Sequence, residues 1–155
     1  MHENFAAYYE RLQSLHKDIG QAIVGLSTEA LDWIPGPGMN SLAVLVVHLT
    51  GAERYWIGDV AGQDPSGRVR STEFKIRGWG SAELQNRLDQ TLVHSQAVLS
   101  KLTLEDLDQM RYSPRNERSY SVAWALAHAL EHTALHLGHI QIGRELWEQE
   151  SRQSD

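Results

Sequence analysis

The most informative absence in this sequence is cysteine, which does not occur among its 155 residues. The chain can therefore form no disulfide, and it offers no thiolate ligand for a metal or an iron–sulfur cluster and no cysteine nucleophile. Any thiol chemistry would need a thiol that comes from outside the chain. Proline is also scarce, with four residues, so long stretches are free to form helices.

Positive charge and long apolar runs are also in short supply. Fourteen basic residues face 20 acidic ones, which gives a formal net charge of −6 and no broad basic surface for nucleic acid or anionic lipid. The longest apolar run, Leu42 to Val47, is far too short to span a membrane, and the N-terminal stretch lacks the pattern of a signal peptide. We expect a cytoplasmic protein that binds neither nucleic acid nor membrane.

Apolar residues recur every three or four positions in four segments, which is typical of amphipathic helices. The pattern predicts helices over about residues 3–26, 41–60, 82–101 and 121–147, within one domain that covers residues 1–155. The turn around Pro35 to Gly38 separates the first two helices. The aperiodic stretch between the second and third helices predicts a long loop that can border a pocket, and the tail after Trp147 is expected to be frayed.

Four of the eight histidines lie within twelve residues of the last predicted helix: His128, His132, His136 and His139. At about 100° per residue they share one face, and His132 with His136 has the i, i+4 spacing that lets two imidazoles bind one metal ion. These two fall within the apolar stripe, whereas the other two lie at its border. His48, in an apolar segment of the second predicted helix, is the favoured source of a third ligand.

Other interpretations of the histidines compete with this one. They can be ordinary helix histidines that are solvated or hydrogen-bonded between helices. The string HALEH also fits the inverted zinc-protease pattern, but that pattern needs a further acidic ligand well downstream, and only 23 residues follow His132. Glu131 also points about 100° away from His132. A peptidase is therefore disfavoured.

The segments HLTGAERYW and EHTALHLGHIQIG, together with the order of the elements, resemble the DinB-like superfamily of four-helix metalloenzymes. The resemblance covers about residues 5–147. It implies an all-α, four-helix bundle of up-down-down-up type, with a divalent metal held by His48, His132 and His136. The sequence departs from the family pattern at Glu131, Leu137 and His139, where asparagine, arginine and glutamine are frequent.

The resemblance also implies frequent dimers and, in some branches, metal-dependent transfer that uses a low-molecular-weight thiol such as bacillithiol or mycothiol as cosubstrate. Three neutral imidazoles leave a divalent ion with open positions for water, substrate or thiol, so both thiol S-transfer and metal-assisted hydrolysis of a small-molecule substrate stay open. Imidazole suits zinc and nickel among other metals. The alternatives are a non-catalytic dimerisation or binding module whose metal is structural or absent, and a plain helical scaffold.

The catalytic residues remain unknown from sequence. The candidates for a general acid or base are Glu53, Asp59, Glu131 and His128, none of which has a spacing that forces a role. The arginines that could contact an anionic substrate are Arg54, Arg68, Arg70 and Arg77. Apolar residues outside the expected core stripes predict a homodimer through the second and fourth helices, with packing under the long loop as the alternative; these are Val46, Ile57, Leu130, Ala134 and Leu137.

Overall fold

The computed structural model describes residues 1–153 and consists mainly of four long helices. These are α1 (Glu3–Ile23), α3 (Leu42–Glu53), α5 (Ser81–Leu99) and α6 (Val122–Gln153), and α3 continues into the π-helical segment η1 (Arg54–Ala61). The shorter elements are α2 (Thr28–Asp32), α4 (Arg70–Glu73), the 3₁₀ helix η2 (Leu104–Asp108) and the strands β1 (Met110–Ser113) and β2 (Arg118–Ser121).

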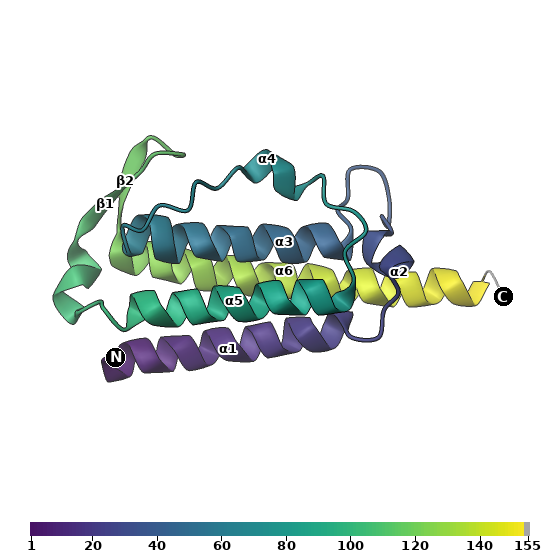
Figure 1. Cartoon of the computed structure of the whole chain (residues 1–155), viewed down its shortest axis with the longest axis horizontal. Coiled ribbons are helices and arrows are strands. Elements are labelled where there is room, and N and C mark those ends of the chain that lie inside the picture. Colours follow the sequence, from purple (N-terminus) through teal and green to yellow (C-terminus); the bar gives the residue numbers. More distant parts are fainter. Residues whose placement is uncertain (154–155) are drawn as a thin grey trace.

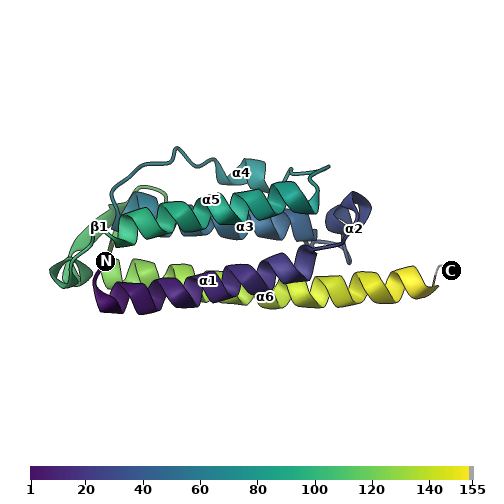
Figure 2. The same cartoon turned by 60° about the horizontal axis from the view of Figure 1, so that its bottom comes forward.

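The four long helices form a bundle of up-down-down-up type, as the resemblance implied (Figure 1). Helices α3 and α5 run in the same direction because the connection between them, which contains α4, returns along the length of the bundle. Figure 2 shows that this connection covers α3 and α5 on the side away from α1 and α6. It therefore forms a further layer of chain over α3 and α5 instead of an open loop.

The core consists of two apolar clusters with buried polar side chains between them. On α3 and η1 the change from one cluster to the other lies between Leu49 and Ala52. On α5, the buried Thr91 and Ser95 lie between Leu88 in one cluster and Val98 in the other. The polar contacts at this level include those of Glu53 with His16 and with Ser95.

The first and last helices differ in length from what the periodicity predicted. Helix α1 ends at Ile23, three residues early, because Val24 is extended and Gly25 has a positive φ of 78°. The expectation of a frayed tail after Trp147 is wrong within the described residues, because α6 continues to Gln153. Its last turns are held by an edge contact between Trp147 and Trp33, with ring centroids 5.6 Å apart. Residues 154 and 155 of that predicted tail lie outside the described residues.

A β-hairpin in the connection before α6 was not predicted. Strands β1 and β2 pair antiparallel, with Met110 opposite Ser121 and Ser113 opposite Arg118. The hydroxyl of Tyr55 lies 2.6 Å from Ser113 Oγ and accepts a hydrogen bond from the backbone N–H of Arg115. These contacts fix the hairpin turn against η1. Within residues 1–153, no helix has both the length and the hydrophobicity needed to cross a membrane.

The residues that suggested a dimer surface are mostly buried inside the chain. Val46 and Ile57 are fully buried, and Leu137 is 8 % exposed. They pack against the other helices and the covering connection, so they provide no free apolar face for a second copy. For these three residues the dimer interpretation is therefore wrong, and the alternative, burial within the chain, holds.

Candidate metal centre

Three histidines from two helices come together in the structure. His48 projects from α3, while His132 and His136 lie one turn apart on α6. One ring nitrogen from each lies within 4.8 Å of the other two, close enough for small side-chain rotations to bring all three onto one ion. No other group of three potential ligands is found within residues 1–153.

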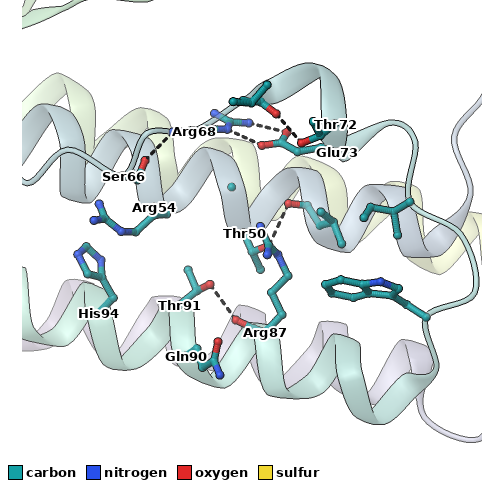
Figure 3. A pocket seen from close by; sticks show the side chains of 15 residues that line it. Thr50, Arg54, Ser66, Arg68, Thr72, Glu73, Arg87, Gln90, Thr91 and His94 are labelled. Atoms are coloured by element: carbon teal, nitrogen blue, oxygen red, sulfur yellow. Dashed lines mark hydrogen bonds and ion pairs between the residues drawn. The ribbon is translucent and has the colours of Figure 1, made fainter.

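The His48 ring is held by a carboxylate that the sequence analysis did not single out. His48 Nδ1 lies 2.9 Å from Glu73 Oε2, and Arg68 donates to both oxygens of Glu73 at 2.6 and 2.8 Å (Figure 3). Burial opposes ionisation of Glu73, but the hydrogen bonds from Arg68 and His48 outweigh it and hold the pKa of Glu73 below its ordinary value. An ionised Glu73 accepts the Nδ1 proton of His48, which leaves Nε2 of His48 free to bind a metal.

His132 and His136 are neutral at physiological pH. Burial, reinforced by the neighbouring imidazoles, lowers the pKa of His132 to about 3 and that of His136 to about 4. Neutral imidazole is the form that binds metal ions. Moreover, Nδ1 of His132 is buried without a hydrogen-bond partner in the described chain, which is costly if no ligand reaches the ring. The residues present therefore fit a divalent ion.

The two outer histidines of the α6 run support this cluster from either side. His139 Nδ1 lies 3.3 Å from His136 Nδ1, so one of these nitrogens donates to the other. His128 stacks on Trp124 with ring centroids 4.8 Å apart and meets the edge of Trp56 at 4.9 Å. The aromatic contacts fix the His128 ring one turn before His132.

A cavity of about 140 Å³ opens beside the cluster. Its lining comes from η1, α4, the hairpin and α6 as well as α3: His48, Ala52, Trp56, Arg70, Arg115, Asn116, His128 and His132. Burial, with Arg68 and Arg70 nearby, lowers the pKa of Arg115 from its ordinary value, and a guanidinium group nevertheless stays charged. The cavity thus combines two candidate metal ligands with two cationic side chains.

Of the four residues that the sequence suggested as a general acid or base, three have other surroundings than the histidine cluster. Glu53 is buried in the core, 2.5 Å from His16 Nε2 and 2.7 Å from Ser95 Oγ. Asp59 pairs with Arg54, and Glu131 is exposed on the surface. Of the four candidates for a general acid or base, the one that lines the small cavity is His128.

Sequence reasoning missed Glu73 and Arg115. Both lie in connections without periodicity, and each reaches the site only through tertiary structure. Of the four arginines that were considered, Arg70 lines the small cavity, and Arg68 binds Glu73. Arg77 donates to the neighbouring carbonyl of Ile76.

The fold and this cluster define a four-helix protein with a three-histidine site of the kind that can hold a metal ion. The family model for mycothiol-S-transferase matches residues 9–149, and the chain belongs to this family. The DinB-like assignment from sequence is thereby confirmed. Among curated proteins, no sequence matches the chain.

Two solved structures share the fold. A conserved protein from Enterococcus faecalis has a TM-score of 0.74 and 13 % identity, over 93 % of this chain and 96 % of its own. YfiT from Bacillus subtilis, described as a probable metal-dependent hydrolase with an unusual four-helix bundle topology, has a TM-score of 0.72 and 16 % identity, over 97 % of this chain and 90 % of its own. At these identities the likeness supports the fold alone.

Proposed function

We propose that this protein is a metal-dependent S-transferase that joins a low-molecular-weight thiol to an electrophilic small molecule. The observation that carries the proposal is the meeting of His48, His132 and His136 beside a cavity large enough for part of a small substrate. Membership of the mycothiol-S-transferase family supports the reaction type and favours mycothiol as the thiol. Because the chain has no cysteine, the thiol enters as a cosubstrate.

In this proposal His48, His132 and His136 hold the ion, and we propose zinc or nickel from among the metals that imidazole suits. A divalent ion with three protein ligands keeps open positions, and it lowers the pKa of a thiol or water that binds there. Glu73 keeps the His48 ring oriented and its Nδ1 protonated. The contact between His139 Nδ1 and His136 Nδ1 orients the His136 ring.

The reaction forms one carbon–sulfur bond and breaks the bond between that carbon and its leaving group. The thiol proton must also be removed. His128 lines the cavity with a ring fixed by Trp124 and Trp56, so we assign the proton to His128, which passes it to the leaving group or to solvent. Arg70 and Arg115 are suited to bind a negatively charged group of the substrate or the developing charge on the leaving group.

Metal-assisted hydrolysis is the second candidate, and the description of YfiT as a probable hydrolase favours it. It would use the same open coordination position with water in place of the thiol. The two reactions differ in what they consume, because S-transfer removes one free thiol for each substrate and hydrolysis removes none. A thiol assay therefore separates them.

The first experiment measures the metal content of untagged protein by mass spectrometry. We expect near-stoichiometric zinc or nickel in the wild type and its loss in the variants His48→Ala, His132→Ala and His136→Ala. His94→Ala is the matched control, since His94 is hydrogen-bonded to Asp64 and lies outside the cluster of three histidines. If the wild type stays metal-free after incubation with zinc and nickel, or if all three variants keep their metal, the proposed centre is wrong.

The second experiment follows the loss of free mycothiol in the presence of an alkylating electrophile such as monochlorobimane. Metal-dependent consumption of thiol that is absent in His132→Ala supports S-transfer. Bound metal together with ester hydrolysis and no thiol consumption would instead support the hydrolase. Bound metal with neither activity would support a non-catalytic binding module.

We also propose a homodimer, formed through α6. Three large apolar side chains repeat on one side of this helix and are well exposed: Trp124, Leu135 and Ile142. Their spacings of 11 and 7 residues place them on one stripe, which a second copy of the same helix could cover. Analytical ultracentrifugation tests this, and a monomer at all concentrations would contradict it.

A further inference from the structure

A second and larger cavity, of about 440 Å³, lies between α3, α5 and the connection that covers them (Figure 3). None of the three clustered histidines lines it. The Arg68–Glu73 pair links it with the metal centre, because Glu73 lines the cavity and is also hydrogen-bonded to His48. The proposed function gives this cavity no role.

Positive charge dominates the lining of this cavity. Arg54, Arg68 and Arg87 contribute guanidinium groups, and Glu73 contributes the one carboxylate among the lining residues. Arg68 already binds both oxygens of that carboxylate, and Arg54 pairs with Asp59 and Asp64. In a protein whose net charge is −6, this local excess of cations needs a reason.

Of the three arginines that line the cavity, Arg87 is the one that forms no ion pair with an acidic side chain within residues 1–153. It crosses from α5 toward α3, where its Nε donates to Thr50 Oγ1 at 2.8 Å (Figure 3). In the described chain its terminal nitrogens, Nη1 and Nη2, form no hydrogen bond. Burial lowers the pKa of Arg87 from its ordinary value, with Arg68 adding to this and Glu73 opposing it, but the group remains charged. Its free nitrogens are thus available to a ligand.

Arg68 provides an independent sign of a missing ligand. Its side chain is 6 % exposed, and its Nη1 is buried with no hydrogen-bond partner in the part of the chain that the structure describes. A buried donor of a charged group is seldom left unpaired. Two arginines that line one cavity therefore both have unused donors.

We propose that this cavity binds a small organic anion, whose carboxylate or phosphate group is held by Arg87 and Arg68. The apolar part of such a ligand would lie against Val47, Ile76 and Trp79, which line the same cavity. A guanidinium group matches either oxyanion with two parallel hydrogen bonds. Because the cations lie in a cavity between two helices and not on an open surface, the site suits a small molecule better than an extended polyanion. This site is separate from the metal centre and does not depend on the proposed reaction.

Isothermal titration of the full chain tests the proposal with three probes at constant ionic strength: benzoate, inorganic phosphate and benzyl alcohol. The protein is first stripped of metal on an immobilised chelating resin, so that binding to a metal cannot contribute and no free chelator competes for the site. We expect saturable one-site binding of benzoate or phosphate and none of the neutral alcohol. The tighter of the two anions identifies whether the natural ligand carries a carboxylate or a phosphate.

The variant Arg87→Gln should weaken anion binding about ten- to a hundredfold, the effect of losing one charge-assisted contact. Arg87→Lys should fall between it and the wild type, because lysine keeps the charge and loses the paired donors. Arg11→Gln is the matched control, since Arg11 is exposed on α1 and does not line the cavity. Its affinity should equal that of the wild type.

Two results would overturn the proposal: the absence of saturable anion binding to the wild type, or equal affinity in Arg87→Gln. If Arg87→Gln fails to fold, Thr50→Val replaces it, because this change removes the acceptor that holds Arg87 in place and keeps the side-chain shape. Undiminished binding in Thr50→Val would then contradict the proposal. Anion binding without bound metal would leave this site standing even if the metal centre fails its own test.

Discussion

A single methyl group at Gly51 should weaken metal binding without touching any of the three histidines. Gly51 lies on α3 directly beneath the Arg68–Glu73 pair. A Cβ atom built on it would lie 3.0 Å from Glu73 Cδ and 3.1 Å from Arg68 Nε, and it would overlap Glu73 Oε1. The substitution Gly51→Ala therefore pushes Glu73 away from its place beside His48.

The size of the effect follows from these distances. Carbon atoms in contact prefer a separation of about 3.5–4.0 Å, so Glu73 must retreat by about 0.5–1 Å. Its hydrogen bond with His48 Nδ1, now 2.9 Å, would then be at or beyond the limit for such a bond. Loss of a partner that orients a metal-binding histidine costs about ten- to a hundredfold in metal affinity. We expect a loss of zinc affinity in this range.

Competition with a chromogenic zinc chelator measures the affinity. Gly138→Ala is the control, because Gly138 lies on α6 between His136 and His139 and a Cβ atom there meets nothing within 4 Å. Its zinc affinity should be unchanged. In a Glu73→Ala background, Gly51→Ala should have no further effect, since both changes act on the same hydrogen bond. Wild-type affinity in Gly51→Ala, or fully additive losses in the double variant, would refute this reasoning.

Two further predictions concern stability. Because the folded-state pKa values of His132 and His136, about 3 and about 4, lie below the ordinary value of 6.5, the unfolded chain binds protons that the folded chain does not as pH falls below 6.5. Urea unfolding of metal-free protein should therefore show a stability loss of at least about 1.4 kcal/mol between pH 7 and pH 5; an unchanged free energy of unfolding would contradict the buried, neutral state. His16→Ala removes one of the two hydrogen-bond partners that the described chain gives the buried Glu53 and leaves Ser95 as the other. It should lower the free energy of unfolding by about 3–5 kcal/mol, compared with less than about 0.5 kcal/mol for the exposed Glu10→Ala. Unimpaired stability of His16→Ala would show that the buried pair contributes nothing.

The helices were predictable because their cause is local. Apolar residues repeating every three or four positions make one face of each helix buried wherever the neighbours lie. What the pattern could not show was where α6 ends, since its last turns depend on the contact of Trp147 with Trp33, far away in the sequence. The β-hairpin also escaped prediction, because its strands have four residues each and are fixed by Tyr55.

The cluster of histidines was partly predictable for the same reason. The i, i+4 spacing of His132 and His136 follows from helix geometry alone, whereas the approach of His48 depends on how α3 packs against α6. Glu73 carries no local signal: it lies in a four-residue helix of the covering connection. Periodicity describes one element at a time, and this carboxylate acts between two elements.

Three residues that suggested a dimer surface are buried within the chain instead. Val46, Ile57 and Leu137 lie outside the stripes expected for a helix with one buried face, which suggested a second contact surface. Val46 is buried because α3 is enclosed on all sides, with the connection between α3 and α5 over its outer face (Figure 2); each residue of α3 is buried. Ile57 and Leu137 pack into the two apolar clusters of the core. The pattern of a single helix cannot distinguish burial by its own chain from burial by a partner.

The sequence by itself determined the helical class of this protein, the absence of chain-borne thiol chemistry and the placing of two histidines on one helical face. These properties depend on composition and on the geometry of one helix. Only the tertiary structure decided that His48 joins the pair, that Glu73 and Arg68 hold its ring, and that Arg87 faces a cavity without an acidic partner among residues 1–153. The reason is that side-chain pairing across elements depends on how the helices pack and on the path of the connection that covers them, and neither is encoded in a local pattern.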